Sequence, residues 1–171
     1  MKKTLFFIAF VAMISCIQAQ ELQQNRTEVK FNGLSFAIGA VDFEFERTLN
    51  KYSSVGMSFR LAYKEGQYSE ISTFYRRYLG KNHASGFFVE GFALYHQKKD
   101  LFNRTFDVGT LSVLETRSDF ALGVGIGYKY VSKKGLILQA HVGAGRNIFN
   151  GKNSYGELHP GKAGISIGYG F

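Results

Sequence analysis

The chain has 171 residues, a length typical of a single domain, and combines 20 Gly, 17 Phe and 10 Tyr with one Pro and no Trp. Its aromatic content excludes an intrinsically disordered chain, since disordered chains are poor in aromatic residues. The formal net charge is +8, but Lys and Arg cluster only as pairs, so the charge does not predict binding to nucleic acid.

Residues 1–19 have the parts of a secretory signal peptide. Lys2 and Lys3 form a basic start, an apolar stretch of about ten residues follows, and Ala19 is a small residue at the expected cleavage point. The apolar stretch is too short for a membrane-spanning helix, which needs about 20 residues. We therefore expect export with cleavage after Ala19, and residues 20–27 as a polar, flexible lead-in.

Cys16, the only cysteine, offers a second processing route. Residues 13–16 resemble a loose lipobox, in which Cys16 would be acylated and become the new N-terminus. The junction after Ala19 is the better site. Cleavage there leaves the mature chain without cysteine, which excludes disulfides and Cys-based metal or nucleophile chemistry.

The rest of the chain is predicted to be a series of strands. Apolar residues alternate with small or charged residues at a period of two, the period of a strand with two unlike faces. A convincing period of 3.6 is absent, so no helix is predicted after the signal peptide. The predicted strands cover residues 28–38, 41–48, 54–64, 68–79, 86–98, about 113–131, 136–148 and 164–171.

The number and spacing of these strands favour a membrane barrel. The connections after the second, fourth and sixth strands are short, whereas those around 98–112 and 149–160 are long. Outer-membrane barrels have an even number of strands, short periplasmic turns and longer external loops. The sequence thus predicts an eight-stranded antiparallel up-and-down transmembrane β-barrel over residues 28–171, with both long loops outside the cell.

One face of several predicted strands is uniformly apolar, and we expect it to contact lipid. The alternation is clearest in the sixth strand and in the last one, whose other face holds mainly Gly. The residues predicted to face lipid are Phe120, Leu122, Val124, Ile126, Tyr128, Leu136, Leu138, Ile165 and Ile167.

The opposite faces mix small residues with charges, and we expect them to line the lumen. Glycines of the last three strands would leave room there for larger side chains from the opposite wall. Charges of both signs can pair, which a narrow interior requires because unpaired buried charges are costly. The predicted lumen network consists of Asp42, Glu44, Glu46, Arg60, Glu70, Arg76, Glu90 and His141. The inverse arrangement, with charges outside and aromatics inside, would instead be a soluble, lipocalin-like barrel.

The last strand is predicted to close the barrel, pairing with the seventh strand and with the first strand near Leu34 and Phe36. It ends in the aromatics Tyr169 and Phe171, which suit a girdle at the periplasmic rim. These two residues also resemble the C-terminal signal that the barrel-assembly machinery reads, although Ser166 stands where a Gly is usual.

Three stretches resemble an uncharacterised family of small outer-membrane barrels of Gram-negative bacteria. They are Glu46-Arg47 after the alternating Phe residues, residues 74–79 (Phe-Tyr-Arg-Arg-Tyr-Leu) and residues 86–91 (Gly-Phe-Phe-Val-Glu-Gly). More broadly, the chain resembles eight-stranded barrels of the OmpA/OmpX type. The resemblance implies a fold and an outer-membrane location rather than an activity.

We therefore expect a monomeric envelope component that interacts through its external loops. Its expected partners are outer-membrane lipid, lipopolysaccharide and the barrel-assembly machinery. No cofactor or metal is expected, since the four His residues lack metal-site spacing. Three alternatives stay open: a narrow channel, an outer-leaflet lipid-modifying enzyme using groups such as His83 and Ser85, and a soluble lipocalin-like carrier.

Overall fold

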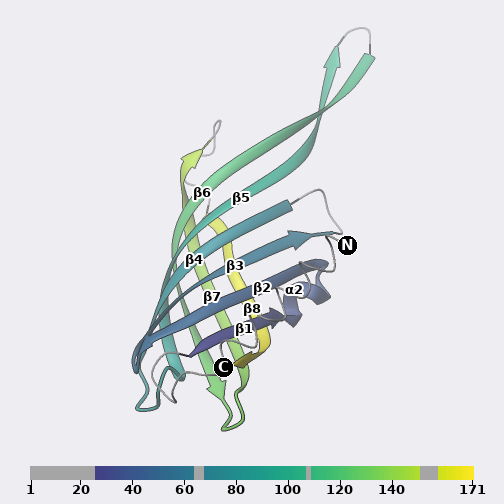
Figure 1. The fold of residues 1–171 in the computed structure, drawn as a ribbon. Coiled ribbons are helices and arrows are strands. Elements are labelled where there is room, and N and C mark those ends of the chain that lie inside the picture. The colour runs from purple at the N-terminus through teal and green to yellow at the C-terminus, as the bar shows by residue number, and fades with distance from the viewer. Residues whose placement is uncertain (1–25, 64–67, 107–108, 151–157) are drawn as a thin grey trace, which may run out of the picture.

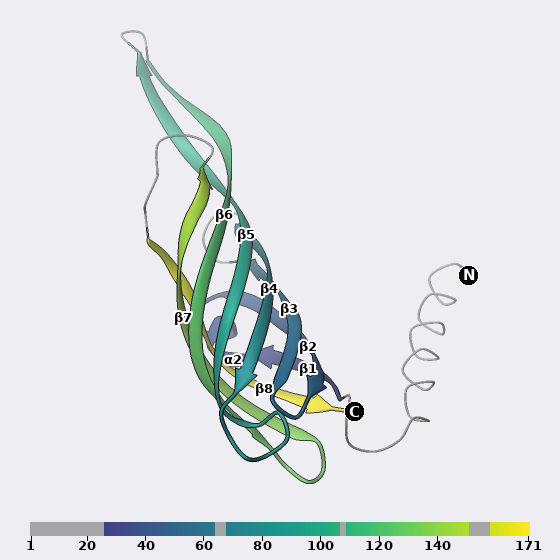
Figure 2. The same ribbon diagram turned by 90° about the vertical axis from the view of Figure 1, so that its left-hand side faces the viewer.

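The computed structural model describes residues 26–63, 68–106, 109–150 and 158–171. These residues form one closed antiparallel barrel, in which each strand pairs with its neighbours in sequence and the last strand pairs with the first (Figures 1 and 2). The predicted fold class, an eight-stranded up-and-down barrel, is confirmed. The elements are β1 (Thr27–Asn32), α2 (Gly33–Ala37), β2 (Ala40–Asn50), β3 (Ser53–Ala62), β4 (Tyr68–Tyr78), β5 (Gly86–Phe106), β6 (Gly109–Val131), β7 (Leu136–Asn150) and β8 (Leu158–Gly170).

The prediction of one strand over residues 28–38 is wrong in its second half, and so is the expectation of no helix. β1 ends at Asn32, whose side-chain oxygen accepts a hydrogen bond from the Ser35 N–H at 3.2 Å and so caps α2. Gly39, with a φ of 100°, then turns the chain into β2. The outward side chains of α2 are apolar, so their alternation resembles that of a strand.

β8 closes the barrel on β1, as predicted, but it pairs with residues earlier in the chain than expected. Val29 pairs with Tyr169 and Phe31 with Ile167. Leu34 and Phe36, the expected partners, belong instead to α2, which packs against β8. The helix therefore covers the place where a longer first strand would have continued.

The predicted loop over residues 98–112 is mostly a β-hairpin. β5 runs to Phe106 and β6 begins at Gly109, and the two strands pair over this whole length. Their pairing with β4 and β7 stops at Lys98 and Asp119, so within the described residues the outer part is a two-stranded ribbon. Figure 1 shows it extending beyond the barrel, away from the C terminus. A polar composition does not prevent pairing of antiparallel strands, which can turn a face to solvent.

Several predictions fall partly outside the described residues. The signal peptide, Cys16 and most of the lead-in lie within residues 1–25, although Thr27 already belongs to β1. Of the predicted loop 149–160, the two ends belong to β7 and β8, and residues 151–157 lie outside. In the described part of the chain, no helix has the length and apolar character needed to cross a membrane.

Candidate functional site

The barrel wall separates two kinds of side chain, and this separation defines the lumen. On β2, Asp42, Glu44 and Glu46 are buried, while Phe43 and Phe45 between them are exposed. The same alternation orients β4, where Arg76 is fully buried and its neighbour Arg77 is exposed. Every residue of the predicted lumen network points inward, with Arg60 partly accessible and the others buried.

Arg76 lies at the centre of the lumen and connects three strands. Its Nε donates to Glu90 at 2.8 Å, and its Nη1 donates to Glu44 at 2.7 Å and to Glu46 at 2.5 Å. The guanidinium carbon also lies 4.0 Å from the ring centre of Phe74 and 4.6 Å from that of Phe88. Aromatic faces favour such a cation, most strongly where water is excluded.

Two lysines complete the charge balance around these carboxylates. The Lys30 Nζ donates to Glu44 at 2.6 Å and also to Glu46. The Lys129 Nζ donates to Glu46 and to Glu28, each at 2.9 Å. Glu46 therefore accepts hydrogen bonds from three cations, which offsets the desolvation of its charge.

A second cluster contains three more of the predicted residues, Asp42, Arg60 and Glu70. The Arg60 guanidinium donates to Asp42 at 3.0 Å and lies 3.5 Å from Glu70. Asp42 also accepts hydrogen bonds from Asn32 and Ser35, each at 3.0 Å, so it ties α2 to the lumen. The predicted single network is therefore two clusters, one around Arg76 and one next to α2.

His141, the last predicted lumen residue, lies beside the Arg76 cluster. Its Nδ1 is 3.3 Å from the Gln139 amide, which also donates to Glu44 at 3.2 Å and accepts from Lys30 at 2.9 Å. Gln139 thus couples the histidine to the charges.

The sequence interpretation missed several members of the network. The sequence pattern could have identified them, because in each strand they lie on the same face as residues that were predicted to face the lumen. Glu28 and Lys30 alternate with apolar residues of β1, and Lys129 continues the glycine face of β6. The lumen residues that were missed include Glu28, Lys30, Lys129, Gln139 and Lys162.

The lumen glycines make room for side chains of the neighbouring strands, among them aromatic rings and the Lys30 side chain. A Cβ at Gly123 would lie 2.3 Å from the Phe92 ring, and one at Gly127 would lie 2.4 Å from the Phe88 ring. Both rings come from β5, which pairs directly with β6. Phe92 also packs with Phe74 in a small apolar cluster inside the barrel.

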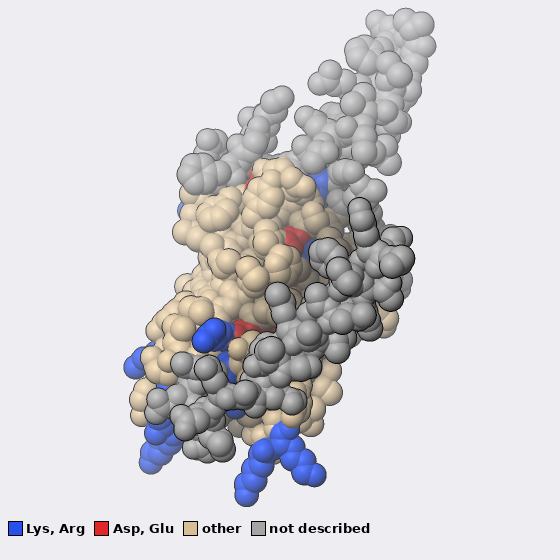
Figure 3. Space-filling view, viewed as in Figure 1, with Lys and Arg blue, Asp and Glu red and all other residues tan. Residues whose placement is uncertain are grey.

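The outer wall carries large apolar side chains. Val124 is 72% exposed and Ile126 is 60% exposed. All the residues predicted to face lipid are exposed except Phe120, which is half-buried. Tyr169 and Phe171 are also exposed, at the end of the barrel where the Thr27 N–H donates to the Phe171 carbonyl at 3.0 Å. In Figure 3 the visible outer face is mostly uncharged, and Lys and Arg gather near this lower end.

The described ranges contain no three His, Cys, Asp or Glu side chains placed to hold a metal ion. His83 lies on the turn between β4 and β5, next to Ala84, whose N–H donates to the Lys51 carbonyl at 2.8 Å. Partial burial and the nearby cations Arg26, Lys51 and Lys129 lower the pKa of His83. This turn and the C terminus share one end of the barrel, the end opposite the long hairpin.

Comparison with known proteins identifies the fold. No family model and no curated protein matches the chain. Among solved structures, it is similar to the N-terminal β-barrel domain of Pseudomonas aeruginosa OprF, with a TM-score of 0.56 and 15% identity. The match covers 86% of this chain and 98% of that domain. The chain thus has the fold of an OmpA-type eight-stranded barrel.

Proposed function

We propose that the protein is an outer-membrane barrel with a structural or surface-interaction role. The observation that carries this proposal is the inverted distribution of polarity, with paired charges inside and large apolar side chains outside. A soluble barrel has the opposite arrangement, because its outer face meets water. The structure therefore lacks the inverse, lipocalin-like pattern considered from the sequence.

The lengths of the connections at the two ends of the barrel support one orientation in the membrane. The turns after β2 and β6 contain two and four residues, 51–52 and 132–135, at the end shared with the C terminus. Short turns face the periplasm in outer-membrane barrels. In this orientation α2 and the long β5–β6 hairpin face the cell exterior. We propose that the hairpin is the surface that contacts lipopolysaccharide or another partner.

The proposal includes the assembly route. Tyr169 and Phe171 are outward-facing at the periplasmic end, accessible to an assembly factor that reads the last strand. We expect export by the N-terminal signal and insertion by the barrel-assembly machinery, and no catalytic step.

The substitution Val124→Arg tests the membrane assignment directly. Val124 is 72% exposed in the middle of β6. If its surroundings are lipid, we expect the free energy of unfolding in phospholipid vesicles to fall by about 2–4 kcal/mol, because Arg is unfavourable on the lipid face. If its surroundings are water, an exposed Arg is nearly neutral.

The control is Lys133→Ala on the β6–β7 turn, which is exposed but outside the apolar wall. It should unfold at the same urea concentration as the wild type. Fractionation provides a second readout: the wild-type chain should require detergent for extraction and shift on a gel after boiling. A chain that stays soluble without detergent, together with a neutral Val124→Arg, would overturn the proposal.

A further inference from the structure

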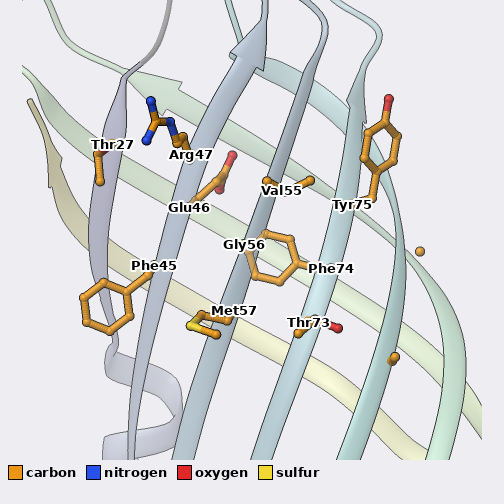
Figure 4. A pocket seen from close by; sticks show the side chains of 12 residues that line it. Thr27, Phe45, Glu46, Arg47, Val55, Gly56, Met57, Thr73, Phe74 and Tyr75 are labelled. Carbon is orange, nitrogen blue, oxygen red and sulfur yellow. The ribbon is translucent and has the colours of Figure 1, made fainter.

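Two shallow apolar grooves lie side by side on the outer wall. The first, of about 650 Å³, is lined by residues of β1–β5 that include Phe45, Met57 and Thr73 (Figure 4). The second, of about 820 Å³, is lined by residues of β4–β7 that include Val124 and Ala144. Tyr75 and Gly91 line both grooves, so the two meet there.

Gly91 is a glycine that neither the backbone nor the packing requires. Its φ is not positive, and an added Cβ would have no heavy atom within 4 Å. At Gly123 and Gly127 of the neighbouring strand, by contrast, a Cβ would collide with an aromatic ring. The missing side chain of Gly91 thus has one structural consequence, which is to keep the junction of the grooves open.

A group of cations lies at the periplasmic end of the same wall. The Lys51 Nζ and the Arg77 guanidinium carbon each lie 5.4 Å from the ring centre of Tyr52. Arg77 lines the second groove, whereas the Arg47 side chain lies toward Thr27 of β1 (Figure 4). Within the described part of the chain, Arg77 forms no ion pair. Like charges gathered at one ring favour an anion between or beside them.

We infer that this surface binds one anionic diacyl phospholipid of the periplasmic leaflet. Its phosphate would lie at Lys51 and Arg77, and its two hydrocarbon chains would occupy the grooves on either side of Tyr75. The geometry fits the membrane position: Arg77 is the second-last residue of β4, whereas Gly91 lies five residues into β5, farther from the rim. The inference rests on the proposed outer-membrane location.

Native mass spectrometry of the full chain in detergent micelles tests the site. The probes are dioleoylphosphatidylglycerol, which is anionic, and dioleoylphosphatidylcholine, which is zwitterionic. We expect one phosphatidylglycerol to bind at least tenfold more tightly than phosphatidylcholine. The double variant Lys51→Gln/Arg77→Gln should lose roughly 30-fold in affinity for phosphatidylglycerol, since each cation near an anionic lipid contributes about a fivefold factor.

Filling the groove is the second arm of the test. Gly91→Leu should weaken binding of both lipids, because its side chain occupies the junction of the grooves without disturbing the barrel. Ala140→Leu is the matched control, since Ala140 is exposed on β7 outside both groove linings. Lys133→Gln/Lys134→Gln is the charge control on another periplasmic turn. Both controls should bind as the wild type does.

The outcomes separate the lipid site from the membrane assignment. Each sample is checked for the shift in gel migration on boiling, which reports a folded barrel. If the barrel is folded but Gly91→Leu binds as the wild type does, or both lipids bind equally, the lipid site is wrong and the membrane barrel stands. If the wild type neither needs detergent nor shows the shift, the membrane assignment itself fails.

Discussion

At the scale of single residues, the lumen depends on the mutual compensation of buried charges. Arg76 is completely buried and contacts three carboxylates, and Glu46 in turn contacts three cations. Removing water from such ions is expensive, and their mutual attraction mainly offsets that expense. The network therefore adds little to the net free energy of unfolding. Removing any one of its members, however, should destabilise the barrel strongly.

Arg76→Met should lower the free energy of unfolding by about 3–5 kcal/mol, because it leaves buried carboxylates without their shared cation. Urea titration in vesicles, followed by the gel shift, measures this loss. Arg77→Met is the neighbouring control, with an exposed side chain on the other face of the wall. Its effect should stay within about 1 kcal/mol. Equal effects of the two substitutions would contradict the arrangement of charges described above.

At the scale of the strand, glycines on the two faces have different roles. Gly123 and Gly127, inward glycines of β6, are sites where aromatic rings of β5 lie against the backbone. A Cβ at Gly127 would also lie 2.6 Å from the Ala140 carbonyl oxygen, which is backbone and moves little. Gly91, on the outer face, meets no such limit.

Gly127→Ala should accordingly destabilise the barrel by about 1–3 kcal/mol, the usual effect of overpacking. Gly91→Ala is the same substitution in an open position and should be neutral or slightly stabilising, since Ala restricts the unfolded chain more than Gly does. Thermal unfolding followed by circular dichroism compares the two. A larger loss of stability at Gly91 than at Gly127 would contradict the tight packing at Gly127 and the open position of Gly91.

The β5–β6 hairpin is the element that depends least on the barrel. Beyond Lys98 and Asp119, its described strands pair with each other and not with β4 or β7. Replacing residues 100–117 with an Asn-Gly turn, which suits a two-residue hairpin, should leave folding and the gel shift unchanged. Loss of folding would mean that the hairpin supports the barrel. If the hairpin is the contact surface we propose, binding of the purified barrel to lipopolysaccharide should fall.

At the scale of the whole molecule, closure brings the charges of β1 to β6 and of β8 into one interior. An eight-stranded barrel has an interior just wide enough for side chains to fill. Here those side chains are held by charge-assisted hydrogen bonds and by rings that stack on the cations. The closed wall also leaves no free strand edge within the barrel proper, which suits surroundings that cannot hydrogen-bond to the backbone.

We therefore expect the reconstituted barrel to carry no steady ion current in a planar bilayer. The reason is that Arg76, Lys30 and Glu46 block the middle of the lumen with fully buried side chains. The Glu44→Gln variant should likewise carry no steady ion current, since the amide keeps the volume of the carboxylate. A steady current in the wild type that changes with Glu44→Gln would establish the narrow channel instead.

Periodicity along the chain was sufficient to predict the barrel, most of its strands and the two faces of the strands. Phe43, Glu44, Phe45 and Glu46 alternate in sequence, and a strand turns that alternation into an outside and an inside. The same rule, applied to Glu28, Lys30 and Lys129, would have found the missing cations and carboxylate. Periodicity could not distinguish α2 from a strand, because a local hydrogen bond from Ser35 to Asn32 ends β1.

The pairing of the charges, by contrast, depends on how far each strand is shifted against the next. Lys129 and Glu28 are 101 residues apart, and only closure of the barrel brings them within 2.9 Å. Register also places the rings of β5 over the glycines of β6, and it sets Gly91 between two grooves. Alternation is a property of neighbouring residues, whereas these contacts join distant strands, so they exist only once the closed barrel has formed.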